Sequence, residues 1–166
     1  MAERDSGVLI ATPLNILIAE DNADDVVLLG HAFQKAGFAG HLSAVSDGVE
    51  ALAYLEGEGV FADRTAHPFP DFLLLDLNMP QKNGFEVLAS VRTDSKYSRL
   101  MVHVLTASSR PADVERAYDL HANSYTVKPS RLDQLVAFAG ALLQWHTFIA
   151  RTQSIPKGFE EASSHR

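Results

Sequence analysis

Five short apolar runs divide the sequence, and stretches with helical spacing separate them. The runs are continuous rather than alternating, which is typical of strands buried on both faces of a sheet. They lie at residues 15–19, 42–45, 71–75, 101–105 and 124–127. Between them, apolar side chains recur at three- and four-residue steps, as helices with one buried face require. We expect helices at residues 24–35, 47–56, 84–92, 111–120 and 131–150.

This alternation predicts a doubly wound α/β fold with a five-stranded parallel sheet and five helices. Asp24 and Asp47 lie near helix starts, where a carboxylate can cap free N–H groups. Pro111 suits the first turn of its helix. We expect a flexible leader at residues 1–13, one folded domain at 14–150 and a tail at 151–166, with a long loop at 56–70 before the third strand.

Composition narrows the function classes. The chain has 166 residues, no cysteine and a formal net charge of -7. Without cysteine there is neither a disulfide framework nor a thiolate metal site. The negative charge argues against nucleic-acid binding and against docking on an anionic membrane. The first fourteen residues lack the long apolar core of a signal peptide or membrane span, so we expect a cytoplasmic protein.

Polar side chains follow four of the five predicted strands. Glu20 and Asp21 end the first strand, Asp76 the third, Thr106 the fourth and Lys128 the fifth. Ligands of open α/β sheets bind at the carboxyl ends of the strands. We therefore expect these three carboxylates, the hydroxyl and the amine to converge on one site.

Three neighbouring carboxylates repel one another unless a cation neutralises them. Oxygen ligands suit Mg²⁺, which prefers a few carboxylates together with phosphate oxygens. An Asp beside the metal can attack phosphorus and form an acyl phosphate. Lys128 would pair with the phosphoryl oxygens, and the Thr106 hydroxyl would donate to one of them. The pattern predicts magnesium-dependent phosphorylation of Asp76.

Four segments of the chain resemble the signature blocks of bacterial response-regulator receiver domains: ILIAEDNADD, LLLDLNMPQKNGFEVL, VLTAS and SYTVKPS. The resemblance extends over about residues 15–144 and implies a flavodoxin-like strand order of 2-1-3-4-5. It implies that Asp76 is the phosphoacceptor. Asp21, Asp76 and the Asn78 backbone carbonyl would ligate Mg²⁺, and Glu20 would act mainly through a metal-bound water.

The same resemblance assigns the switch residues. Thr106 would move onto the phosphoryl group, Tyr125 would swing inward with it, and small Ala107 would leave room. Lys128 would contact the phosphoryl group, and the bond between Lys128 and Pro129 would be cis. Such a domain is a switch rather than an enzyme, with only self-phosphorylation and slow self-dephosphorylation expected.

A narrower resemblance rests on the loop at 56–70, the long last helix and the segments YDLHANSYTVKP and LQWHTFIARTQSIP. These features resemble single-domain regulators that partner phytochrome-type histidine kinases. The resemblance implies a histidine kinase as the phosphodonor.

The last predicted helix carries two apolar stripes. The first should face the sheet and consists of Leu132, Leu135, Val136, Ala139, Leu142 and Leu143. The second is Phe138, Trp145, Phe148 and Ile149. We expect it to contribute to a homodimer interface made by the predicted fourth helix, fifth strand, fifth helix and C-terminal extension. The alternative is that the C-terminal tail folds back over it. The seven histidines lack a metal-binding pattern, and His103, inside an apolar strand, is expected in the core.

Two other functions remain open at this point. A haloacid-dehalogenase-type phosphohydrolase also uses an Asp, a Thr and a Lys, but it has a second acid two positions after the nucleophile. Asn78 occupies that position here, and the candidate nucleophile follows the third strand rather than the first. A phosphorylation-independent interaction module is the second alternative, although every reactive position is filled.

Overall fold

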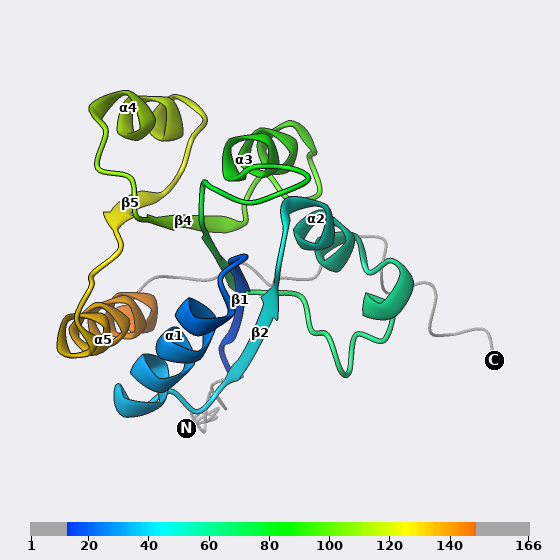
Figure 1. Cartoon of the computed structure of the whole chain (residues 1–166). Coiled ribbons are helices and arrows are strands. Elements are labelled where there is room, and N and C mark those ends of the chain that lie inside the picture. Colours follow the sequence, from blue (N-terminus) through cyan, green and yellow to red (C-terminus); the bar gives the residue numbers. More distant parts are fainter. Residues whose placement is uncertain (1–12, 149–166) are drawn as a thin grey trace, which may run out of the picture.

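The computed structural model describes residues 13–148 and shows a central parallel sheet covered by helices on both faces (Figure 1). The strand order is β2-β1-β3-β4-β5. This confirms the predicted doubly wound fold and its strand order. The strands are β1 (Asn15–Ala19), β2 (His41–Val45), β3 (Phe72–Leu75), β4 (Met101–Thr106) and β5 (Ser124–Val127).

Helices α1 and α5 cover one face of the sheet, and α2, α3 and α4 cover the other (Figure 1). Of the helices within residues 13–148, none is both long and apolar enough to span a membrane. Where the structure describes both ends of an element, each predicted bound lies within one residue of the observed one. The helices are α1 (Ala23–Lys35), α2 (Gly48–Glu56), α3 (Gly84–Thr93), α4 (Pro111–Asp119) and α5 (Leu132–Phe148), with a short 3₁₀ helix, η1, at Gly59–Phe61.

The apolar core has two halves, one on each side of the sheet. On β1, Leu17 and Ala19 face the half under α2 and α3, whereas Ile16 and Ile18 face the half under α1 and α5. All four side chains are at most 1% exposed. The continuous apolar runs therefore belong to strands buried on both faces, as predicted.

Two sequence expectations concerning the backbone need correction. Asn22, not Asp24, caps α1, because its side chain accepts hydrogen bonds from the N–H groups of Asp24 and Asp25. Asp47 caps α2, as expected. The Lys128–Pro129 peptide is trans, since residues 13–148 contain no cis bond. A trans bond is the lower-energy isomer before proline in an unconstrained chain.

The long loop between α2 and β3 is present and is tied to the end of α2. The guanidinium of Arg64 donates to the carbonyl oxygens of Tyr54 and Leu55, both at 2.7 Å. Both carbonyls belong to the last helical turn, where the usual partner four residues on is missing, and the Tyr54 carbonyl also accepts from the Gly57 N–H. The loop thus forms a fixed cover over that end of α2, with η1 inside it.

Helix α5 buries one stripe and exposes part of another. Leu135, Ala139 and Leu142 are buried, as predicted. Of the second stripe, Phe138 is half-buried and packs against the core half under α1 and α5. Trp145 is 42% exposed and Phe148 is 83% exposed. Ile149 lies outside the described residues.

A pair of histidines lies between β4 and α5. Nε2 of His103 and Nε2 of His146 are 3.2 Å apart, and Nδ1 of His103 is 2.6 Å from the Ser124 hydroxyl. The ring of His146 stacks on Phe72. His103 is 2% exposed, which confirms its expected place in the core. The partnership with His146 was not predicted.

Candidate functional site

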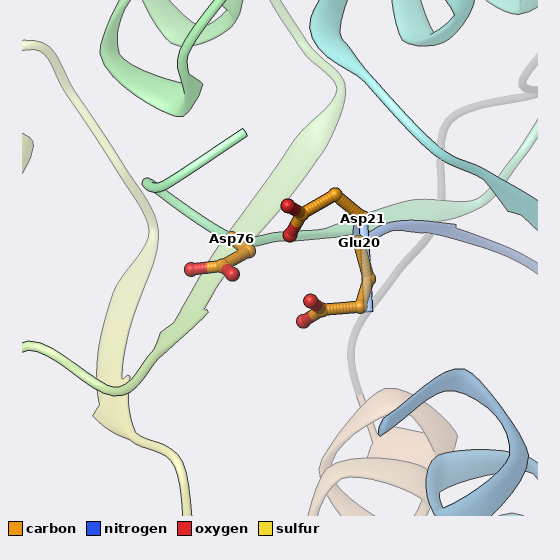
Figure 2. A group of neighbouring side chains, drawn as sticks. All are labelled: Glu20, Asp21 and Asp76. Atoms are coloured by element: carbon orange, nitrogen blue, oxygen red, sulfur yellow. The ribbon is translucent and has the colours of Figure 1, made fainter. Parts of the chain in front are cut away.

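Three carboxylates meet at the carboxyl ends of β1 and β3. Glu20 and Asp21 directly follow β1, Asp76 directly follows β3, and Figure 2 shows the side chains of Glu20 and Asp21 extending toward Asp76. One oxygen from each lies within 4.8 Å of the others. Glu20 and Asp76 are only 4% and 7% exposed, whereas Asp21 is open to solvent. The site is therefore a half-enclosed acidic cluster with one open side.

The Lys128 ammonium supplies the positive charge beside this cluster. Its Nζ is 2.6 Å from Glu20 Oε2, 2.8 Å from Asp25 Oδ2 and 3.8 Å from Asp76 Oδ2. The structure thus brings Lys128 to the predicted acids. Asp25, in the first turn of α1, was missed by sequence reasoning. The only available signal was its position within the segment ILIAEDNADD.

The sheet itself places the reactive side chains. The N–H of Asp76 donates to the Ala19 carbonyl at 3.0 Å, and the N–H of Lys128 donates to the Thr106 carbonyl at 2.7 Å. The parallel ladder therefore continues one residue beyond the strand ends. This extension fixes the backbone of both residues and leaves their side chains to face the site.

A glycine allows α3 to start close to Asp76. A Cβ added to Gly84 would lie 2.2 Å from the Asp76 carbonyl oxygen and 2.8 Å from Leu77 Cα. Both atoms belong to the backbone, so no side-chain movement would relieve the clash. The Gly84 N–H also donates to the Leu77 carbonyl at 2.9 Å. Gly84 therefore holds the segment after β3 in place.

Burial and counter-charge act against each other at this site. Burial raises the pKa of Glu20, and the hydrogen bond from Lys128 lowers it in part. Burial would lower the pKa of Lys128, but the hydrogen bonds to Asp25 and Glu20 outweigh it and raise that pKa. The ammonium therefore stays charged beside the acids.

Thr106 and Tyr125 lie on neighbouring strands and meet the same loop. Thr106 is fully buried, and its hydroxyl oxygen is 3.5 Å from the Ser108 N–H. The Tyr125 hydroxyl donates to the Ser108 carbonyl at 2.9 Å. Tyr125 also packs against the core half under α2 and α3. The two predicted switch residues thus both contact the backbone of Ser108.

The donor set fits a hard divalent cation. It consists of carboxylate oxygens, and four acids, with Asp25 counted, lie near a single ammonium, so negative charge is in excess. Asn78 follows Asp76 by two residues and is exposed, with its N–H 3.4 Å from Asp76 Oδ1. Oxygen ligands with open positions for water are the coordination that Mg²⁺ prefers.

Comparison with known proteins identifies what this arrangement resembles. Residues 16–139 match the model of the response regulator receiver domain. The "Probable methanogenesis regulatory protein FilR2" of Methanothrix harundinacea is 37% identical over 79% of this chain and 83% of its own length. The response regulator Rcp1 of Synechocystis is 36% identical over 74% of this chain and 82% of its own.

Solved structures agree with the sequence matches. The phosphorylated cyanobacterial phytochrome response regulator RcpA has a TM-score of 0.76 and 35% identity, covering 84% of this chain and 99% of that one. The Mn²⁺-bound form of Rcp1 has a TM-score of 0.75 and 32% identity, with the same coverage. The chain is therefore homologous to stand-alone, phytochrome-associated regulators in both sequence and fold.

Proposed function

This chain belongs to the response regulator receiver family, and from that premise we propose that it is a signalling switch phosphorylated on Asp76. The observation that carries the proposal is the placement of Lys128 beside Glu20 and Asp76 at the carboxyl ends of the strands. An acid next to a fixed ammonium is what transfer of a phosphoryl group to a carboxylate requires.

In the proposed step, an oxygen of the Asp76 carboxylate attacks phosphorus. The bond from phosphorus to the donor breaks, and its electron pair leaves with the donor group, a kinase imidazole or acetate. The product is an acyl phosphate on Asp76. Lys128 and the Thr106 hydroxyl would then contact phosphoryl oxygens, and the movement of Thr106 and Tyr125 would change the surface around α4, β5 and α5.

Glu20, Asp21, Asp76 and the Asn78 carbonyl would hold a divalent cation, which we take to be Mg²⁺. When bound, it would screen the charge that develops on the transferred group. The all-oxygen donor set and its excess of negative charge support this choice. Rcp1, similar in fold, has been solved in a Mn²⁺-bound form.

The proposed phosphodonor is a histidine kinase, and its phytochrome type rests on the similarity to RcpA and Rcp1. We expect no turnover beyond self-phosphorylation and slow self-dephosphorylation. The comparisons lend no support to a phosphohydrolase, and Asn78 stands where that family has its second acid. A cytoplasmic location and the absence of nucleic-acid or membrane partners remain predictions.

Incubation with acetyl phosphate and Mg²⁺, followed by intact-mass measurement, tests the proposal. We expect one added phosphoryl group per chain, lost when the divalent ion is chelated and absent in Asp76→Asn. An unmodified wild-type protein would instead support an interaction module that works without phosphorylation. Release of many phosphates per chain in a steady-state assay would support a phosphohydrolase.

We further propose that the signal passes through a homodimer formed by α4, β5, the C-terminal extension that lies outside the described residues, and the outer face of α5. Trp145 and Phe148 are exposed there, and large apolar side chains in water mark interaction surfaces. Phe138 and Ile149 complete the proposed interface, Phe138 from a half-buried position.

Sedimentation of a Trp145→Ser/Phe148→Ser variant should give a monomer. Val60→Ser, on exposed η1, is the control and should sediment as wild type; a dimeric double variant would refute the interface.

A further inference from the structure

Asp25 is the acid in this site that the phosphorylation chemistry does not call for. Its carboxylate lies 2.8 Å from Lys128 Nζ, but it is not one of the three acids whose oxygens cluster for a cation. It comes from the first turn of α1, whereas Lys128 follows β5. The contact thus joins α1 to the end of the last strand at the edge of the site.

The side chain of Asp25 is not needed to start its helix. Asn22 caps α1 by accepting hydrogen bonds from the backbone N–H groups of Asp24 and Asp25. Asp24, in the same turn and with the same charge, is exposed and takes part in none of the ion pairs found within residues 13–148. Only Asp25 is directed to the lysine, so helix capping does not explain its contact.

Lys128 needs an anchor because its side chain is long and flexible. Fixing such a side chain costs rotamer entropy. The two short contacts, to Glu20 and Asp25, hold the ammonium with only 13% of the side chain exposed. Glu20 also belongs to the acidic cluster, so part of its charge would be shared with a bound cation. Asp25 is then the carboxylate that serves Lys128 alone.

The position of the Lys128 ammonium is better suited to contact a phosphoryl group on Asp76 than to contact the Asp76 carboxylate itself. The ammonium is 3.8 Å from Asp76 Oδ2, which is too long for a hydrogen bond. A phosphoryl group on that oxygen would extend into the intervening space. Lys128 would reach it while keeping its contact with Asp25.

Building on the proposed function, we propose that Asp25 is a positioning residue that holds the Lys128 ammonium where the phosphoryl group of Asp76 will need it. It acts through Lys128 and contacts neither the cation nor the phosphoryl group. Without the Asp25 carboxylate, Lys128 is still present, but its ammonium is no longer held at the position from which it would contact the phosphoryl group.

Binding of beryllofluoride in the presence of Mg²⁺, measured by calorimetry on the full chain, tests this role. Asp25→Asn should bind the analogue about tenfold more weakly, the value of one charge-assisted hydrogen bond. The control Asp24→Asn removes the same charge from the same turn and should bind as wild type. Asp25→Glu, which keeps a carboxylate, should restore part of the affinity.

The same substitution in a Lys128→Ala background separates positioning from a general charge effect. There Asp25→Asn should not weaken binding further, because the group through which it acts is missing. Tighter or unchanged binding by Asp25→Asn in the wild-type background would show that Asp25 competes for the lysine or is idle. An equal loss in Asp24→Asn, or a persisting loss without Lys128, would also overturn the proposal. If wild type itself does not bind the analogue, the proposed function fails as well.

Discussion

The acidic site after β1 and β3 and the histidine pair between β4 and α5 are both polar groups set against an apolar core, but different means keep them there. Glu20 and Asp76 are 4% and 7% exposed and lie beside the Lys128 ammonium. His103 and His146 are 2% and 3% exposed and bond to each other. Burial, with a smaller contribution from His146, lowers the pKa of His103 to about 4, so the ring is neutral at neutral pH.

The acidic site is built for chemistry, whereas the histidine pair is part of the packing of the core. The acidic site retains charge, which the core tolerates only because a counter-charge and an open side are present. His103 gives up its charge instead, and both of its ring nitrogens make hydrogen bonds, to Ser124 and to His146. We therefore expect the acidic site to respond to cations and the histidine pair to respond to protons.

Acidification should give the largest effect, and it should come from the histidine pair. The pKa of His103 falls from 6.5 to about 4 on folding, so the unfolded chain takes up its proton first as the pH drops. The contribution of the neutral His103 ring to the free energy of unfolding is fully present above about pH 6.5. It is lost progressively down to about pH 4, by about 3 kcal/mol in all. Urea unfolding at a series of pH values measures the loss.

Other groups titrate in the same range, so His103→Leu is the control. None of the ion pairs within residues 13–148 involves His103, and its polar neighbours are Ser124 and His146. The variant should lose most of the pH dependence, whatever its stability at neutral pH. An unchanged slope would mean that His103 is not the group responsible.

Removing one histidine should have the next largest effect. His146→Leu leaves Nε2 of His103 buried without its hydrogen bond, which should reduce the free energy of unfolding by about 2 kcal/mol at neutral pH. The double variant His103→Leu/His146→Leu removes both partners and should be less destabilised than the sum of the two single variants. Additive losses would contradict coupling between the two rings.

Magnesium should give the smallest effect, and only through the acidic site. At a free concentration ten times the dissociation constant, Mg²⁺ should stabilise the fold by about 1.4 kcal/mol. Asp21→Asn removes an exposed cluster oxygen and should lower this gain, whereas Asp24→Asn should not. Thermal unfolding with and without Mg²⁺ measures the gain, and equal gains in both variants would place the ion elsewhere.

The acidic site could be predicted from the sequence, whereas the histidine pair could not. Glu20, Asp76 and Lys128 were predicted because each directly follows a strand, and parallel strands end at one edge of the sheet. Their convergence needed only the strand positions and the strand order. The bounds of β1 and β5 were predicted to the residue, because apolar runs of this kind end abruptly at polar side chains.

Contacts that depend on how a helix is rotated were not predictable in this way. Asp25 reaches Lys128 because of the way α1 is rotated, and nothing in the spacing distinguishes it from Asp24. His146 meets His103 because α5 turns that face toward β4. Asn22 rather than Asp24 caps α1 because the helix begins at Ala23, so that Asp24 already lies in its first turn.

The location of the phosphoryl group tests the central claim most directly, since three acids cluster at the site and a fourth, Asp25, contacts the same lysine. After phosphorylation with acetyl phosphate and Mg²⁺, reduction with borohydride converts the modified acid to a stable alcohol that peptide mass spectrometry can locate. We predict that this product appears at Asp76 alone. Its appearance at Glu20, Asp21 or Asp25 instead, or at none of the four, would contradict the account.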